Sequence, residues 1–519
     1  MAGAGTRGPG QRAARLRRAA RQRREARSRR AARRRRALAA SAAAEFNRAA
    51  LLVRRAADAA RHPAQHPPPG PFRPGVWRSP LRGLWLTSVL GVVLLAGLTI
   101  LAVTGLLSYA AYDPLLPGND QTPGAGLLRF YMFSWPTHPS WLYRVDQGVH
   151  ITLGLALLPV VLAKLWSVLP RLFAWPPVRS LAQILERVSL VMLVGGVLFE
   201  FATGILNIQN YYVFPFSFYT AHLYGAWVFI AGFVIHVALK FPRMLTGLRS
   251  RSLRRELHTP LSQTRPEDPD TAAPDPVEPD TLEPDRAEPE ATRPGAQGLR
   301  SAAPRTVEGL RAARPRAPTI SRRGLLAAIG GASLTLAGLV VGQSVGGWTR
   351  RTSLFGPRGL SATAPHYLPV NRTAASIGLT AADVGPGYRL TLVGARTVTL
   401  TQAELLRLPQ RAVELPIACV EGWSVAARWT GVRLADLARL AGMREPAGAR
   451  VDSIQQVGAF KSAVLSAGQV ADPQSLLAVT LNGHVLPWDH GYPARTIIPN
   501  APGVHNTKWV SKITFLEQA

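Results

Sequence analysis

The chain has two parts with different patterns of apolar residues. The first part contains five long apolar runs, and in the second part apolar and polar residues alternate over short stretches. The five runs lie near residues 83–108, 149–169, 186–207, 218–240 and 324–347. Each approaches the roughly 20 residues that an α-helix needs to cross the hydrocarbon core of a bilayer. The pattern predicts an integral membrane protein with an all-α bundle of four transmembrane helices and a fifth transmembrane helix.

Basic residues flank the apolar runs unevenly. Residues 1–82, 171–187 and 240–258 are rich in arginine, whereas the connections 109–148 and 208–217 carry few basic groups. Because basic flanks stay on the cytoplasmic side of a membrane, we expect a cytoplasmic N-terminus and four helices of alternating direction. The fifth run then carries the C-terminal part of the chain out of the cytoplasm.

Two polar segments are predicted to be disordered and cytoplasmic. Residues 1–80 form an arginine-rich tail that supplies about half of the net charge of +31, and residues 246–320 form a linker rich in Pro, Asp and Glu. The tail either binds anionic lipid headgroups or only fixes the orientation of the protein in the membrane. No specific nucleic-acid partner is expected. An envelope protein that binds DNA through this tail is an alternative.

The motif Ser321-Arg322-Arg323 precedes the fifth run. It resembles a twin-arginine export signal that is internal and uncleaved, so residues 321–348 are predicted to be a transmembrane anchor. Two ordinary arginines on the cytoplasmic side are the alternative. Such a signal indicates that the protein lies in the cytoplasmic membrane of a bacterium and that residues 360–519 form an exported domain.

Three histidines lie within the apolar runs. His150 and His222 are predicted at similar depth near the outer face, where opposed imidazoles suit ligation of a haem iron; a pair of polar core histidines is the alternative. His236 follows His222 by 14 residues, about 21 Å deeper on the same helix face, where a second haem would fit. The first and third runs offer no histidine to complete that site, and Lys164, at the matching depth, is a poor ligand.

This pattern resembles the cytochrome b subunits of formate dehydrogenases and nickel–iron hydrogenases over residues 81–245. The resemblance implies one or two haem b groups and electron exchange with membrane quinone. In that family the inner haem takes a ligand from the first helix, which has no histidine here. Glu200 is either a proton carrier at such a site or a structural carboxyl group.

Beyond residue 360 the long apolar runs give way to short stretches in which apolar and polar residues alternate. Residues 388–393 and 398–400 alternate like half-buried strands around a turn, and residues 433–442 predict a short amphipathic helix. Residues 494–499 and 509–515 predict two further strands. We therefore expect an α+β domain over residues 360–519.

Cys419 is the only cysteine of the chain. A single cysteine excludes an internal disulfide, a CxxC redox pair and a multi-cysteine zinc or iron–sulfur site. A buried structural thiol, a nucleophile and a lone soft thiolate ligand of a metal remain open.

The sequence around Cys419 resembles the sulfite oxidase family of molybdopterin enzymes, and segments in consistent order extend the resemblance from about residue 365 to 517. The segments are Tyr367-Leu-Pro-Val-Asn371-Arg372, Cys419-Val-Glu-Gly-Trp-Ser, Trp429-Thr-Gly-Val-Arg-Leu, Asn482-Gly483, His490-Gly-Tyr-Pro-Ala-Arg495 and Gly503-Val-His505-Asn-Thr-Lys508-Trp509-Val. The resemblance implies a molybdenum–molybdopterin cofactor with Cys419 as the metal ligand. It also implies cofactor contacts from Asn371, Arg372, His490, Arg495, Gly503, His505 and Lys508, with Arg428 and Arg372 attracting an oxyanionic substrate.

Together these features predict a membrane-bound molybdopterin oxidoreductase that moves an oxygen atom to or from a sulfur or nitrogen oxide. Electrons would pass through haem b to or from quinone. The chain stops soon after Phe515, and in this it is similar to the molybdenum subunit of protein-methionine-sulfoxide reductase, which favours sulfoxide reduction over sulfite oxidation. The alternative is a membrane haem b carrier or scaffold with an inactive molybdopterin-type domain.

Overall fold

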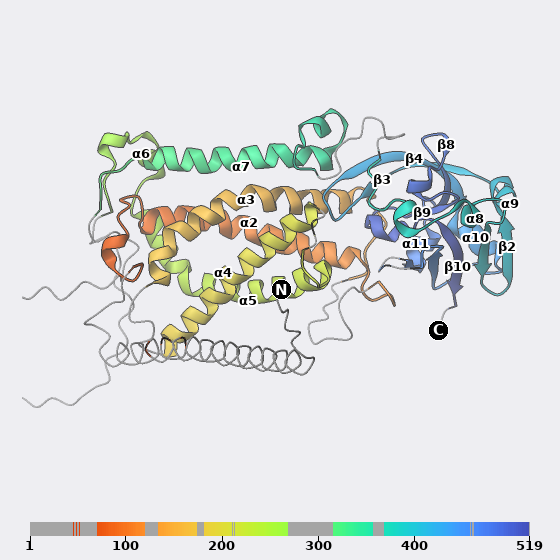
Figure 1. Cartoon of the computed structure of the whole chain (residues 1–519), viewed down its shortest axis with the longest axis horizontal. Helices are drawn as coiled ribbons and strands as arrows, with labels where there is room; N and C mark the ends of the chain where they lie inside the picture. Colours follow the sequence, from red (N-terminus) through yellow and green to blue (C-terminus); the bar gives the residue numbers. More distant parts are fainter. Residues whose placement is uncertain are drawn as a thin grey trace, which may run out of the picture.

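A helical bundle and a sheet domain lie end to end in the computed structural model (Figure 1). The structure describes residues 70–119, 133–173, 181–209, 211, 213–267, 315–356, 368–456, 458 and 461–517, with the isolated positions 45, 48 and 51. Most of the predicted basic tail, and the predicted linker from residue 268 to 314, therefore lie outside the described residues.

Within the described ranges, five helices are long and apolar enough to cross a membrane. They are α2 (Leu84–Ala111), α3 (Leu142–Leu172), α4 (Leu181–Ile208), α5 (Phe218–Arg249) and α7 (Arg322–Val345). They coincide with the five predicted apolar runs, so the prediction of five long apolar helices is confirmed. Large apolar side chains such as Leu334 (76% exposed) and Val191 (70% exposed) cover their outer surfaces, as contact with lipid requires.

The bundle is held together by apolar side chains between neighbouring helices. Helix α2 packs on α3 and α5, α4 packs on α5, and α7 runs along α3 at the edge of the bundle (Figure 1). Leu86, Leu90, Leu157, Val197 and Phe229 are buried in the shared core. The predicted arrangement of four helices with a fifth beside them is present in this packing.

The predicted linker begins later than expected. Helix α5 continues to Arg249 and α6 spans Leu253–His258, so the chain is folded up to Glu267. The Glu267 carboxylate accepts the backbone N–H groups of Leu84 (2.7 Å) and Trp85 (3.0 Å) at the start of α2. The first N–H groups of a helix lack partners within it and attract negative charge, so this contact holds the first part of the predicted linker against α2.

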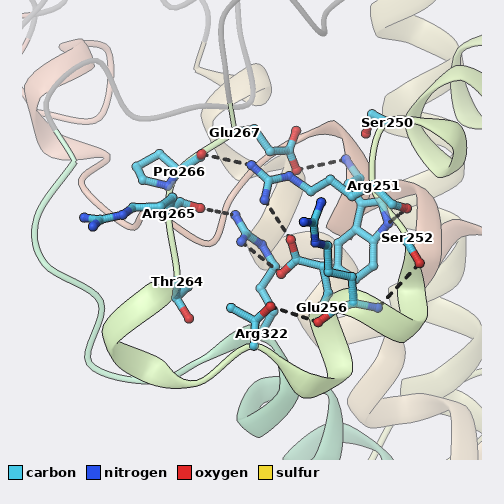
Figure 2. Close-up of polar contacts among 12 residues, drawn as sticks. Ser250, Arg251, Ser252, Glu256, Thr264, Arg265, Pro266, Glu267 and Arg322 are labelled. Atoms are coloured by element: carbon cyan, nitrogen blue, oxygen red, sulfur yellow. Dashed lines mark hydrogen bonds and ion pairs between the residues drawn. The ribbon is translucent and has the colours of Figure 1, made fainter.

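The two arginines of the predicted export motif lie in different environments. Arg322 is 1% exposed and donates to Glu256 (3.3 Å) and to the carbonyl of Arg265 (2.8 Å), as Figure 2 shows. Glu256 also accepts from Arg251 at 2.7 Å. Arg323 is exposed. Arg322 therefore joins the start of α7 to α6, while export by this motif stays a prediction.

The C-terminal part contains two sheets and is α+β, as predicted. The first has the order β2-β1-β10-β5-β6, with β1 and β10 parallel and the other neighbours antiparallel; the second has the order β3-β4-β7-β8, with β9 paired to β7. The strands are β1 (Arg389–Val393), β2 (Thr397–Thr401), β3 (Arg411–Ala418), β4 (Ser424–Arg433), β5 (Gly448–Ser453), β6 (Ser462–Ser466), β7 (Leu476–Leu481), β8 (His484–Val485), β9 (Arg495–Ile497) and β10 (Val510–Leu516). The short helices are α8 (Ala381–Val384), α9 (Gln402–Arg407), α10 (Leu434–Leu440) and α11 (Ala467–Ala471).

Alternating apolar side chains build the core of this domain. Leu390 and Leu392 of β1 are fully buried and share a cluster with Leu434 and Leu437 of α10, because side chains two apart in a strand face the same side. The predicted hairpin is β1 and β2, the predicted amphipathic helix is α10, and the two later predicted strands are β9 and β10. These predictions are confirmed.

Hydrogen bonds fix the sheet domain to one end of the bundle. The Asn500 side chain accepts from the backbone N–H of Tyr143 (2.7 Å) and donates to the carbonyl of Pro136 (2.7 Å). The Asn500 carbonyl accepts from the Trp135 indole at 2.7 Å. Paired bonds also join Asn119 to the backbone of Val464 at 2.8 and 3.0 Å. These contacts are buried, so the domain and the bundle have a defined relative position.

Candidate functional site

Cys419 lies in a tight turn between β3 and β4. Its N–H donates to the carbonyl of Trp423, and its carbonyl accepts from Gly422, both at 2.9 Å. Gly422 has φ of +91°, and a Cβ atom there would lie 2.9 Å from Ile151 of α3. A glycine is required by this backbone conformation and by the close approach to the bundle. The turn therefore fixes the sulfur of Cys419, which is 4% exposed.

Cys419 opens onto a cavity that gathers residues distant in sequence. Five of the predicted cofactor-binding residues line it, namely Asn371, Arg372, Arg495, Gly503 and Lys508. Tyr219, Gln455, Asn506 and Thr507 line it as well and were not predicted. The cavity thus combines one soft sulfur donor with several cationic and polar groups.

Arg495 is a buried cation at this cavity. It is 3% exposed, donates to the carbonyls of His490 (3.0 Å) and Asn506 (2.9 Å), and lies 5.3 Å from the ring centre of Trp429. No carboxylate pairs with it among the residues that the structure describes, and burial lowers its pKa to about 9. A buried guanidinium without a carboxylate suits a bound anion as its counter-charge.

Thr507, which lines the cavity, and His505, which lies in the same segment but is not a lining residue, carry further polar atoms. Both are 2% exposed, and in the described part of the chain neither His505 ring nitrogen nor the Thr507 hydroxyl has a hydrogen-bond partner. Burial lowers the pKa of His505 to about 4, so the neutral ring can both donate and accept at neutral pH. Buried polar groups normally find partners. The site therefore fits a polar, anionic ligand such as a pterin phosphate.

Lys508 and His490 hold the loops around the cavity. The Lys508 ammonium donates to the carbonyls of Arg372 (2.9 Å) and Asp489 (2.8 Å). His490 is 3% exposed and contributes its carbonyl to Arg495, but its side chain is not among the cavity-lining residues. The Lys508 side chain, which lines the cavity, therefore ties the two loops together.

Arg428 corrects one sequence prediction. Its side chain is exposed on β4 and does not line the Cys419 cavity. Its neighbour Trp429 is fully buried, and successive side chains of a strand point to opposite faces. Arg428 therefore points away from the site, and Arg372 is the member of the predicted substrate-attracting pair that reaches it.

A second, mainly apolar cavity lies between the bundle helices. His150 of α3 and His222 of α5 both line it, with ring centres 6.5 Å apart. Two imidazoles on opposite sides of one metal ion, each bonded at about 2 Å, would have ring centres about 6 Å apart. Gly105 and Gly204 also line the cavity beside these rings. The two rings are neighbours, as histidines predicted at similar depth should be, and their separation fits a haem iron between them.

The other intramembrane candidates lie differently. His236 is not among the residues that line this cavity, and the ammonium of Lys164 donates to the carbonyl of Thr87 at 2.5 Å. The Lys164 ammonium is thus held by a backbone carbonyl, and a second haem stays a prediction. Glu200 lines the cavity, with its Oε2 atom 2.9 Å from Nδ1 of His222.

The two cavities meet at the boundary between the sheet domain and the bundle. Tyr219, at the start of α5, and Val420, which directly follows Cys419, line both of them. The Cys419 turn is therefore the shared wall between the sulfur donor and the histidine pair.

Comparison with known proteins identifies the C-terminal part. Residues 380–519 match the family described as oxidoreductase molybdopterin binding domain. The chain is 31% identical over 157 residues to sulfite oxidase, mitochondrial, from Rattus norvegicus, covering 24% of this chain and 29% of the relative. It is 27% identical over 158 residues to nitrate reductase [NADH] from Ulva prolifera, covering 24% of this chain and 18% of the relative. A sulfite oxidase-type molybdopterin-binding domain is therefore present, and it spans less than a third of these relatives.

A solved structure, that of the sulfane dehydrogenase SoxCD from Paracoccus pantotrophus, is similar over 26% of this chain and 39% of that chain. The identity is 24% and the TM-score is 0.24.

Sequence reasoning missed several residues of both sites. Thr507 and Asn506 lie inside the segment that resembles the sulfite oxidase family, so their position there was available as a signal. Tyr219 stands at the start of an apolar run and offered none. Thr104 and Thr203, which contact the two histidines, could have been found by comparing the first and third apolar runs, because each contains Thr-Gly followed by Leu or Ile and then Leu.

Proposed function

We propose that this protein is a membrane-bound molybdenum oxidoreductase that transfers an oxygen atom to or from a sulfur or nitrogen oxide. One observation carries the proposal: Cys419, Arg495 and Lys508 gather around one cavity in a domain of the molybdopterin-binding family. A thiolate is a suitable additional ligand for a soft, redox-active metal. The cationic and neutral donors beside it suit the phosphate of a pterin.

In this proposal the residues in and beside the cavity have separate roles toward the metal, the cofactor and the substrate. Cys419 would hold the metal, Arg495 and Lys508 would bind the anionic end of the cofactor together with His505 from the adjoining segment, and Asn371 and Gly503 would border its pterin. When bound, the cofactor supplies two-electron oxygen-atom chemistry. Arg372 lines the cavity and attracts an oxyanionic or sulfoxide substrate towards it.

The histidine pair gives the proposal its electron partner. His150 and His222 would hold haem b in the apolar cavity next to the Cys419 turn, and that group would supply one-electron chemistry suited to a membrane quinone partner. Five apolar helices support a place in a membrane. We propose a bacterial cytoplasmic membrane, with the N-terminus in the cytoplasm and the sheet domain outside, because arginine-rich flanks such as 240–258 lie at the bundle end opposite that domain (Figure 1).

The test begins with metal analysis of the purified full-length protein. About one molybdenum and one haem per chain are expected, whereas haem without molybdenum would favour an electron carrier with an inactive domain. Reduced haem is then mixed with methionine sulfoxide, and oxidised haem with sulfite, to show the direction of oxygen transfer. Cys419→Ser should abolish both reactions while the haem spectrum survives. Full activity in that variant would overturn the proposal.

A further inference from the structure

The two histidines of the bundle cavity have matching threonine partners. Oγ1 of Thr104 lies 3.0 Å from Nδ1 of His150, and Oγ1 of Thr203 lies 3.0 Å from Nδ1 of His222. Each threonine comes from a helix other than its histidine, since Thr104 is on α2 and Thr203 is on α4. The bundle therefore presents the same contact twice.

The direction of these hydrogen bonds follows from the threonine hydroxyl groups. Thr104 donates to the carbonyl of Ile100 at 2.9 Å, and Thr203 donates to the carbonyl of Phe199 at 2.8 Å. A hydroxyl has one proton to donate, so each threonine oxygen accepts from the imidazole. With the hydroxyl proton on the helix carbonyl, each ring donates from Nδ1, and Nε2 is then the nitrogen whose lone pair is open to a metal.

The residues next to the threonines support the same arrangement. A Cβ atom on Gly105 would lie 3.2 Å from Cε1 of His150, and one on Gly204 would lie 3.7 Å from Cε1 of His222. The sequence Thr104-Gly105-Leu-Leu in α2 thus corresponds to Thr203-Gly204-Ile-Leu in α4. Threonine binds one edge of the ring, and the glycine leaves space beside it.

We propose that Thr104 and Thr203 are positioning residues that set the tautomer and orientation of the two iron-ligating histidines. The inference rests on the proposed haem site and adds a second layer to it. The surroundings of the two histidines differ in one respect, because Oε2 of Glu200 also lies 2.9 Å from Nδ1 of His222. Partners of this kind orient a ligand ring and raise its basicity.

The test replaces each threonine by valine, which has the same shape and no hydroxyl. Thr104→Val, Thr203→Val and the double variant are compared with Thr104→Ser and Thr203→Ser, which keep the hydroxyl. Thr99→Val is the matched control, because Thr99 is an exposed threonine on α2 that donates to the carbonyl of Leu95 at 2.6 Å and does not line the histidine cavity. Haem is removed from the solubilised protein, and its rebinding, absorption spectrum and midpoint potential are measured.

Each valine variant should bind haem about 10–100-fold more weakly, the range seen when such outer partners of a metal ligand are removed. Its spectrum should shift from the six-coordinate form, and the serine variants should restore both properties. Haem affinity within twofold of wild type, with an unchanged spectrum and potential, would overturn the inference alone. A wild-type protein that binds no haem would overturn the proposed haem site together with it.

Discussion

The side-chain amide of Gln147 donates a 3.3 Å hydrogen bond to the carbonyl of Val420, the residue after Cys419. The next two carbonyls of the turn are bound in the same way, because Gln343 donates to Glu421 (3.4 Å) and Ser344 donates to Gly422 (2.5 Å). Three consecutive carbonyls beside the sulfur are thus each held by a side chain from α3 or α7. Of these three side chains, only Gln147 also lines the histidine cavity.

Gln147→Leu should loosen the Cys419 turn and slow electron exchange between the two sites. Loss of the hydrogen bond to the Val420 carbonyl costs about 1 kcal/mol, which corresponds to roughly fivefold faster local opening of the turn by amide hydrogen exchange. Electron exchange is followed by flash reduction of haem and the decay of its reduced absorption band.

Ser344→Ala is the matched control for Gln147→Leu, because it removes a hydrogen bond to the same turn without touching the histidine cavity. It should raise amide exchange to a similar extent and leave the electron-exchange rate closer to wild type. Equal slowing in both variants would show that docking of the turn, rather than Gln147 itself, limits the rate.

Arg495→Gln should reduce molybdenum content. A hydrogen bond to a charged group contributes about 1.5–3 kcal/mol, so cofactor affinity should fall roughly 10–150-fold. Arg428→Gln is the control, since that arginine is exposed and away from the cavity. Molybdenum per chain, measured by mass spectrometry, should fall only in the first variant. Equal losses in both variants would remove Arg495 from the cofactor site.

His505 should make the protein less stable in acid. Burial lowers its pKa to about 4, whereas an unfolded histidine titrates near 6.5. Between these values the unfolded chain binds a proton that the folded chain does not, so stability falls as the pH falls. The loss at pH 5 is about 2 kcal/mol relative to pH 7.

His505→Gln should remove that part of the acid sensitivity. The apparent melting temperature of the detergent-solubilised protein, measured at pH 7 and at pH 5, provides the comparison. The decrease between the two pH values should be smaller in the variant. An identical decrease would mean that His505 is protonated in the folded protein.

Arg322→Gln should destabilise the junction between α6 and α7, whereas Arg323→Gln should not. Removing one partner of a buried ion pair costs about 3 kcal/mol, at the lower end of the usual range because Arg251 still pairs with Glu256. A change at exposed Arg323 should stay within about 0.5 kcal/mol. Thermal unfolding of the solubilised protein measures both.

The same arginines also test the export prediction. If Arg322 and Arg323 act as an export signal, then Arg322→Lys and Arg323→Lys should both reduce the amount of sheet domain that protease reaches in spheroplasts. A loss confined to the Arg322 variant would point to the buried structural role alone.

Local periodicity was enough to predict most elements of this protein. The five apolar runs became α2, α3, α4, α5 and α7, because a helix that faces lipid must be apolar along its whole length. Alternation around residue 390 predicted the hairpin of β1 and β2 for a similarly local reason. The folding of residues 250–267 could not be predicted, because it depends on the α2 N-terminus, about 180 residues earlier in the chain.

The sequence by itself determined which chemical groups are available: a single thiolate at Cys419, cations in the segments after it, and histidines on two apolar helices. Only the tertiary structure decided which of them meet. It turned Arg428 away by strand alternation, brought Arg495 to the cavity, and placed Val420 at the wall of the histidine cavity. The physical reason is that residue type and local period are written along the chain, whereas proximity arises from packing between segments that are far apart in it.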